Sequence, residues 1–201
     1  MSRITLAIGV FLGLILSAVL TGVLIGRKYQ FNGSIIEPLY QAPDFTLMDQ
    51  YGEEFNLANQ TGKVNLIFFG YTSCPDVCPV TLSEFGKIYN GLGDDREGVN
   101  LLFITVDPER DIGDRLKKYL ENFTSPILGL TGDTSVLEEV WQDYGVLRIK
   151  QGGSNSDEEN YLVDHTARLY AIDKNGNLRI TYPYGFPVEG IIEDVRYLLE
   201  E

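Results

Sequence analysis

The residues best suited to chemistry are two cysteines and one histidine. The chain of 201 residues contains Cys74, Cys78 and His165, and it has no other thiol or imidazole. Two thiols this close in sequence can form a disulfide, share a metal ion, or be small buried side chains. They are too few for a disulfide scaffold, a four-thiolate zinc site or an iron–sulfur cluster. The pair is therefore predicted to be a local redox pair or a metal pair, with two incidental buried thiols as the alternative.

The sequence around the cysteines predicts that they lie between a buried strand and a helix. The nearly continuous apolar run over residues 64–71 is typical of a strand buried on both faces. Apolar residues then recur at helical spacing over residues 82–92. A thiol near a helix start ionises more readily, because the helix N-terminus carries partial positive charge. Pro79 disfavours helical geometry at Cys78, so residues 74–77 are expected to form a loop leading into the helix.

His165 follows a polar segment, residues 152–160, and stands at the head of a predicted strand. A single histidine is ordinarily a surface residue or a hydrogen-bonded core residue; the alternative is a metal ligand, with Asp164 orienting its ring. Soft thiolates select Cu(I) or zinc, and imidazole suits Cu(II) and zinc. A structural zinc site needs a fourth protein ligand, and none is evident. Two thiolates and one imidazole therefore favour copper.

The segment Asp107–Asp111 follows a second buried strand, residues 101–106, and should lie near the same sheet edge. One interpretation is a turn in which Asp111 caps the following helix. The other is that this segment structures the metal loop or contacts a partner. Asp76, Asp107 and Asp164 are expected to support the site without binding the ion.

The remaining pattern predicts one α/β domain. Strands are expected at 64–71, 101–106, 127–130, 161–163, 167–172 and 178–182, and helices at 82–92, 116–123, 136–144 and 191–199. Residues 43–57 read as an N-terminal hairpin, and Asp173–Asn177 as a hairpin turn built around Asn-Gly. This order describes a sandwich with helices on both faces of a sheet. We place this domain at residues 42–201, after a linker at residues 29–41.

The N-terminal segment predicts a membrane anchor. Residues 4–26 include no charged residue, and as a helix they reach about 35 Å, enough to cross a hydrocarbon core of about 30 Å. The alternative is a cleaved signal peptide, for which Leu16-Ser17-Ala18 is a poor cleavage site. Residues 1–28 are therefore expected to be a transmembrane anchor. Its orientation is open, because the positive charge on the two sides of the segment is nearly equal: Arg3 and the terminal amine before it, and the basic residues 27 and 28 after it.

The rest of the chain is strongly acidic. All 29 acidic residues but only 13 of the 16 basic residues follow residue 28. Such a surface repels nucleic acid and anionic lipid headgroups. We therefore expect no nucleic-acid binding, and basic partners are favoured. The plainer interpretation of this charge is solubility.

These motifs together resemble the Sco/SenC family of copper-binding, thioredoxin-like assembly factors for respiratory cytochrome c oxidase. The resemblance extends from about Ala42 onward and is based on Phe69–Pro79, Thr105–Asp111 and Val163–Thr166, with Ala42–Phe45 and Gly129–Gly132 in addition. It implies that Cys74, Cys78 and His165 bind copper. It also implies a domain exported from a single N-terminal anchor, on the periplasmic side of a bacterial inner membrane or facing the mitochondrial intermembrane space. Met1-Ser2-Arg3 is too short for a transit sequence, which favours the bacterial membrane.

The resemblance leaves two functions to separate. The leading hypothesis is a metallochaperone for the dinuclear copper site of cytochrome c oxidase subunit II, with another copper donor or a thiol reductase as a further partner. The alternative is an enzyme, a thiol–disulfide oxidoreductase that reduces the partner's cysteines through a Cys74–Cys78 disulfide without delivering metal. A peroxidase or redox-signalling module is weaker, because the Thr or Arg constellation that a peroxide-reducing cysteine needs is not found.

Overall fold

The computed structural model describes residues 11–14, 17, 29–152 and 161–201 of the chain. Two compact units are present, residues 1–30 and residues 31–201. In the first unit, residues 11–14 and 17 are helical, and most of the predicted membrane span at residues 4–26 lies outside the described residues. Within the described part of the chain, no helix is both long and apolar enough to cross a membrane. Most of the predicted loop at residues 152–160 also lies outside it.

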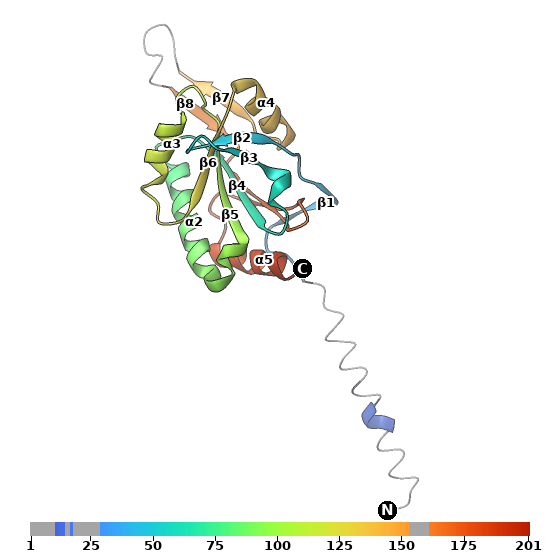
Figure 1. Cartoon of the computed structure of the whole chain (residues 1–201). Coiled ribbons are helices and arrows are strands. Elements are labelled where there is room, and N and C mark those ends of the chain that lie inside the picture. The colour runs from blue at the N-terminus through green and yellow to red at the C-terminus, as the bar shows by residue number, and fades with distance from the viewer. Residues whose placement is uncertain (1–10, 15–16, 18–28, 153–160) are drawn as a thin grey trace, which may run out of the picture. The chain divides into compact units, whose positions relative to one another are not determined.

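Strands and α-helices alternate in the middle of the second unit, whereas strands follow one another at its start and before its last helix (Figure 1). The strands are β1 Ser34–Gln41, β2 Thr46–Asp49, β3 Glu54–Asn56, β4 Val64–Gly70, β5 Val99–Thr105, β6 Ile127–Thr131, β7 Arg148–Gln151, β8 Leu162–His165, β9 Arg168–Ile172 and β10 Asn177–Pro183. The helices are α2 Val77–Leu92, α3 Gly113–Leu120, α4 Thr134–Asp143 and α5 Val188–Glu200. The predicted hairpins are present as β2–β3 and β9–β10.

One large mixed sheet organises this unit. Its strand order is β1-β10-β9-β4-β5-β6-β2-β3, and β7 pairs with β8 in a separate two-stranded sheet. β4 is parallel to β5, and β5 is parallel to β6. All seven residues of β4 are buried, which confirms the strand predicted from the apolar run. Because β4 and β5 end at the same edge of the sheet, the segments that follow them lie close together.

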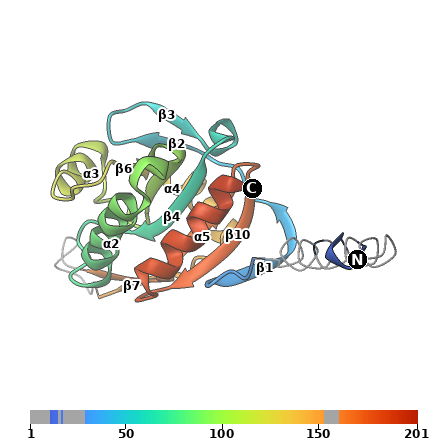
Figure 2. The ribbon, with the colours of Figure 1, turned by 90° about the horizontal axis from the view of Figure 1, so that it is seen from below.

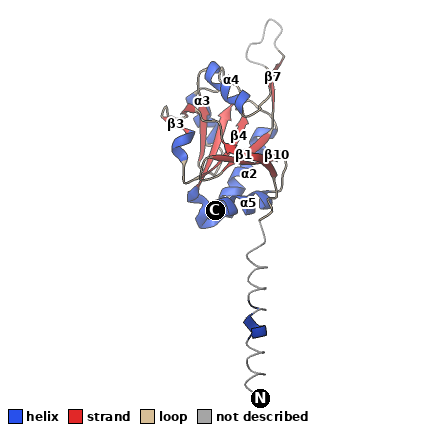
Figure 3. Ribbon diagram, turned by 90° about the vertical axis from the view of Figure 1, so that its right-hand side faces the viewer, coloured by secondary structure: helices blue, strands red, loops and turns tan. Residues whose placement is uncertain are grey.

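Helices cover both faces of the sheet, as predicted. On one face, α2 and α5 lie side by side (Figure 2). Phe68 points to this face, beside Thr81 and Phe85 of α2. The next residue of β4, Phe69, points the other way and packs against Tyr144, which directly follows α4. The strands therefore form the central layer of the unit (Figure 3).

The sequence predicts a linker over residues 29–41, but Ser34–Gln41 form β1, which pairs antiparallel with β10. β1 lies at the sheet edge, and all but one of its eight residues are exposed. An edge strand so exposed does not need alternating apolar residues, so its sequence lacks the usual strand signal. Pro38 falls where the register with β10 shifts, a position that an edge strand tolerates.

Candidate metal centre

The cysteines and the histidine meet at the sheet edge where β4 ends. Cys74 lies in the segment between β4 and α2, residues 71–76, which we call the cysteine loop. Cys78 lies in the first turn of α2, and His165 is the last residue of β8. One donor atom from each of the three side chains lies within 4.8 Å of the other two. No second group of three His, Cys, Asp or Glu donors converges in this way among the described residues.

The start of α2 differs from the prediction. The helix begins at Val77, so Val77 and Cys78 are helical and the loop ends at Asp76. Pro79 lies in the first turn, where a backbone N–H would have no partner within the helix and its loss has little effect. That position outweighs the bias that a proline imposes on the residue before it. As a result, the backbone N–H of Cys78 points at Sγ of Cys74, 3.4 Å away.

The two thiols differ strongly in acidity. Both are free; Cys78 is fully buried and Cys74 is half-buried. The hydrogen bond from the Cys78 thiol lowers the pKa of Cys74 to about 4; His165 and two backbone N–H groups contribute in the same direction, and burial opposes them. The same hydrogen bond, followed by burial and the charge on Cys74, raises the pKa of Cys78. At neutral pH the pair therefore holds one proton, which lies on Cys78.

The His165 ring is oriented toward the sulfurs. It forms T-shaped contacts with the rings of Phe68 and Tyr71, whose centroids lie 6.1 and 5.9 Å away. Nδ1 lies 3.3 Å from the carbonyl oxygen of Thr166, and Nε2 lies 3.7 Å from Sγ of Cys78. A proton on Nδ1 can be donated to that carbonyl, which leaves the lone pair of Nε2 directed at the sulfurs.

Two of the aspartates expected to support the site lie on its outside. Asp164 is exposed, because it points to the opposite face of β8 from His165, and it accepts a hydrogen bond from Gln151. The ring is therefore oriented by Thr166 and not by Asp164. Asp76 is exposed at the start of α2, and its side chain makes no capping hydrogen bond. Only its backbone N–H acts on Cys74.

Residues 107–111, which we call the bridging segment, contact the cysteine loop through Asp111. This carboxylate is fully buried. It accepts hydrogen bonds from the backbone N–H and the hydroxyl of Thr72, at 3.0 and 2.6 Å, and from the hydroxyl of Thr105, at 2.8 Å. The residue preceding α3 is Ile112, and α3 has no side-chain cap. Of the two roles considered for Asp111, the structure therefore supports structuring the loop.

The other end of the bridging segment contacts the chain leading to His165. Asp107 is fully buried and accepts hydrogen bonds from the hydroxyl of Tyr161 and from Nε of Arg110. The guanidinium of Arg110 lies 3.6 Å above the Tyr161 ring and donates to the Tyr161 carbonyl oxygen at 3.0 Å. Sequence reasoning did not identify Tyr161 or Thr72, because hydroxyl-bearing residues at loop ends have no distinctive sequence signal.

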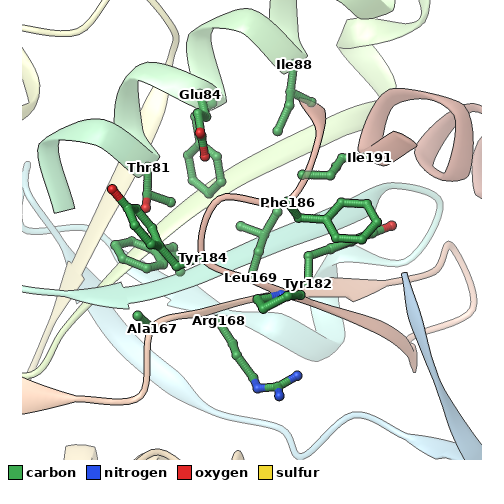
Figure 4. A pocket seen from close by; sticks show the side chains of 13 residues that line it. Thr81, Glu84, Ile88, Ala167, Arg168, Leu169, Tyr182, Tyr184, Phe186 and Ile191 are labelled. Carbon is green, nitrogen blue, oxygen red and sulfur yellow. The ribbon is translucent and has the colours of Figure 1, made fainter. Parts of the chain in front are cut away.

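A narrow apolar hollow is lined in part by Phe68, whose ring also meets that of His165. Figure 4 shows Thr81, Leu169 and Ile191 around it. It holds about 320 Å³ of empty space including its open mouth, and side chains from α2, β9, β10 and α5 line it, among them Glu84, Leu169 and Tyr182. None of its lining residues is a cysteine or a histidine. The hollow therefore supplies no thiolate or imidazole donor to a metal ion.

The three donors fit a single soft metal ion. Donor atoms bonded to one ion at about 2.3 Å lie at most about 4.6 Å apart. The observed separations, all within 4.8 Å, are close to that limit, so small side-chain rotations suffice to bring the donors together. Two sulfurs and one imidazole suit Cu(I), and the imidazole extends the range to Cu(II) and zinc.

Comparison with known proteins gives consistent matches. The family model described as SCO1/SenC matches residues 36–200. SCO2-like protein RP587 of Rickettsia prowazekii is 40% identical over 132 residues, which are 66% of this chain and 64% of that protein. The chain thus aligns with slightly less than two thirds of this relative's length.

Solved structures are similar over most of the domain. Bradyrhizobium japonicum ScoI with copper bound superposes with a TM-score of 0.71 at 35% identity, covering 79% of this chain and 99% of that one. Apo Sco1 from Thermus thermophilus gives a TM-score of 0.75 at 33% identity, covering 86% and 99%. The thioredoxin-like α/β fold expected from the sequence is thus confirmed.

Proposed function

The chain belongs to the SCO1/SenC family, and we propose that it binds copper through Cys74, Cys78 and His165 as a metallochaperone for cytochrome c oxidase assembly. The convergence of these three donors within 4.8 Å is the observation on which the proposal depends. The similar ScoI structure with copper bound supports the choice of metal. Two thiolates hold Cu(I), and the imidazole completes the site, above all for Cu(II).

The proposed recipient is the dinuclear copper site of oxidase subunit II, with copper as cargo. The unequal burial of the two sulfurs suits a transfer between proteins. Cys78 is fully buried at the start of α2, whereas Cys74 is half-buried in the cysteine loop. An incoming thiolate of the partner can therefore displace Cys74 while Cys78 still holds the ion.

Thiol–disulfide exchange is the second candidate, and the lowered pKa of Cys74 favours it. The Cys74 thiolate attacks a disulfide of the partner, forms a mixed disulfide and releases one partner thiolate. Cys78 then loses its proton and attacks Cys74 Sγ, which releases the second partner thiolate. The partner disulfide is reduced to two thiols, and the Cys74–Cys78 pair is oxidised to a disulfide.

We further propose that residues 1–28 anchor the chain in a bacterial inner membrane and that the unit of residues 31–201, which includes β1, lies on the periplasmic side. The uncharged apolar run over residues 4–26 supports the anchor. Export also suits the chemistry, because a disulfide between Cys74 and Cys78 persists in the periplasm but is reduced in the cytosol.

Anaerobic titration with Cu(I) tests the main proposal. We expect one equivalent of Cu(I) to bind and Cys74→Ala to abolish it; an unchanged stoichiometry in that variant would refute the site. His165→Ala should weaken Cu(II) binding more than Cu(I) binding, because two thiolates suffice for the softer ion. If His165→Ala nevertheless restores oxidase assembly in cells that lack this protein, thiol exchange is favoured over copper delivery.

A further inference from the structure

The cysteine loop is fixed to the sheet from its inner side by one residue that is not a ligand. Asp111 accepts all three of its hydrogen bonds from Thr72 and Thr105, and it has no exposed surface. Thr105 is the last residue of β5, so the carboxylate joins the loop to the end of a central strand. Removing the carboxylate leaves buried donors without acceptors and frees the loop that contains Cys74.

Arg115 holds the outer side of the same loop. Its Nε donates to Oγ1 of Thr72 at 2.8 Å, and its Nη2 donates to Oγ of Ser73 at 2.6 Å. The same Nε lies 4.0 Å from Asp111. Because the Arg115 side chain is half exposed, water competes for these contacts, and the buried carboxylate is the stronger restraint.

The strand that ends in His165 is fixed by a different carboxylate. Asp107 accepts the hydroxyl of Tyr161, and Arg110 lies over the Tyr161 ring and binds the Tyr161 carbonyl oxygen. Tyr161 immediately precedes β8. The backbone N–H of Val163, within β8, donates to the hydroxyl of Tyr71 at 3.2 Å. These contacts set the position of β8 and, through it, the imidazole.

We propose that Asp111 and Asp107 are positioning residues with separate tasks, the first for the thiolates and the second, through Tyr161, for the imidazole. The bridging segment supplies no ligand, yet it sets the distance between the two halves of the centre. This inference rests on the proposed copper function. It predicts that each half of the centre can be weakened without the other.

Asp111→Ala tests the thiolate half. We expect it to lower Cu(I) affinity by about 10- to 100-fold, the range seen when residues that orient metal ligands are removed. Asp111→Asn should recover part of the affinity, because its single carbonyl oxygen can still accept from Thr72 and Thr105. Cu(I) affinity is measured in the full-length chain by competition with a chromophoric Cu(I) chelator.

Tyr161→Phe tests the imidazole half. It removes the hydroxyl bound by Asp107 but keeps the ring beneath Arg110. We expect Cu(II) affinity to fall and the nitrogen hyperfine signal of bound Cu(II) to change, while Cu(I) affinity stays within about twofold of the wild type, since Cu(I) depends on the thiolates.

Asp194 of α5 and its hydrogen-bond partner Tyr182 offer matched controls. Asp194 is equally buried, and it accepts hydrogen bonds from the backbone N–H groups of Asn32 and Gly33 and from the hydroxyl of Tyr182. Asp194→Ala and Tyr182→Phe should destabilise the fold to a similar extent but leave both copper affinities and the Cu(II) spectrum unchanged. If these controls bind copper normally, a loss of copper affinity in Asp111→Ala or Tyr161→Phe cannot be explained by a loss of fold stability alone.

Each outcome decides the inference. If Asp111→Ala binds Cu(I) as tightly as Asp194→Ala does, the thiolate role is wrong; if Tyr161→Phe weakens Cu(I) and Cu(II) equally, the division of tasks is wrong. If Asp111→Ala does not fold, Thr72→Val removes one of the same hydrogen bonds and should give a smaller loss of Cu(I) affinity. A Thr72→Val variant that binds Cu(I) as tightly as the wild type would overturn the proposal. Failure of the wild-type chain to bind copper would instead refute the proposed function.

Discussion

Sγ of Cys78 lies 3.7 Å from Nε2 of His165, although 87 positions separate the two residues in the chain. The contact exists because β4 delivers the cysteines to one sheet edge and the separate β7–β8 hairpin brings the histidine to the same edge. It places the imidazole next to a buried thiol that keeps its proton at neutral pH, beside a second sulfur that does not. Several measurable properties depend on this difference in protonation between Cys78 and Cys74.

The first prediction concerns protons released on copper binding. Because the pKa of Cys74 is lowered to about 4 and that of Cys78 is raised, only the Cys78 proton must leave when both sulfurs bind Cu(I) near neutral pH. Cu(I) affinity should then rise about tenfold per pH unit between about pH 7 and 9. Below pH 4 both thiols carry protons, and the slope should approach two.

This dependence can be measured by competition with a chelator whose own pH dependence is known. His165→Ala serves as a control, since the slope between pH 7 and 9 should be unchanged without the imidazole. A slope of two near neutral pH would mean that Cys74 is an ordinary thiol, contrary to the effect of its hydrogen bonds.

The second prediction concerns alkylation. Cys74 is half-buried and ionised, whereas Cys78 is fully buried and protonated, and only the thiolate reacts. Iodoacetamide at neutral pH should therefore label Cys74 first, as read by mass spectrometry of the native apo protein. In Cys74→Ser, labelling of Cys78 should be much slower until the protein is unfolded. Faster labelling of Cys78 than of Cys74 in the wild-type protein would contradict the assignment.

The central layer of the fold could be predicted from the sequence because its signals are local. The apolar run that became β4 and the Asn-Gly turn between β9 and β10 each specify their own structure. β1 and β7 have no such signal, because their residues are mostly exposed. β1 is an edge strand of the large sheet, and β7 belongs to the separate two-stranded sheet. Exposed strands do not require an apolar pattern.

The candidate site was predictable to a different degree. Residue type alone marked Cys74, Cys78 and His165, because few side chains provide soft or imidazole donors. The contacts that hold them could not be read in the same way. Asp111 faces Thr72 and Thr105 only after two strands have paired, and nothing in its neighbours distinguishes this carboxylate from a helix cap. Asp164 is next to His165 in the sequence, but the alternation of side chains along a strand turns it to the outside.

The third prediction concerns the close packing of Gly70 at the end of β4. A Cβ atom there would lie 2.6 Å from the Phe103 ring, 2.9 Å from the Phe68 ring and 3.0 Å from Sγ of Cys78. Gly70→Ala should therefore destabilise the apo protein by about 1–3 kcal/mol, the usual effect of overpacking. It should also weaken Cu(I) binding, because the new methyl group displaces the sulfur. Urea unfolding and Cu(I) competition measure the two effects.

Gly113→Ala is the control for this substitution. Its added Cβ would have no neighbour closer than 3.7 Å, so it should unfold at nearly the same urea concentration as the wild type and bind Cu(I) normally. If Gly70→Ala and Gly113→Ala behave alike, the rings around Gly70 relax freely and the sulfur is not pressed from that side.

The last prediction concerns Tyr71, which contacts both His165 and Val163 of β8. Its ring meets the His165 ring edge-on, and its hydroxyl accepts the backbone N–H of Val163 at 3.2 Å. Tyr71→Phe keeps the ring but leaves that buried N–H without an acceptor, which should destabilise the protein by about 1–3 kcal/mol. The lost bond joins Val163 of β8 to the Tyr71 side chain, so hydrogen exchange at Val163 should accelerate more than exchange at residues of β4. Cu(II) affinity should also fall more than Cu(I) affinity. Uniform acceleration across β4 and β8 would instead indicate global destabilisation, and β8 would then be held by the Tyr161 contacts alone.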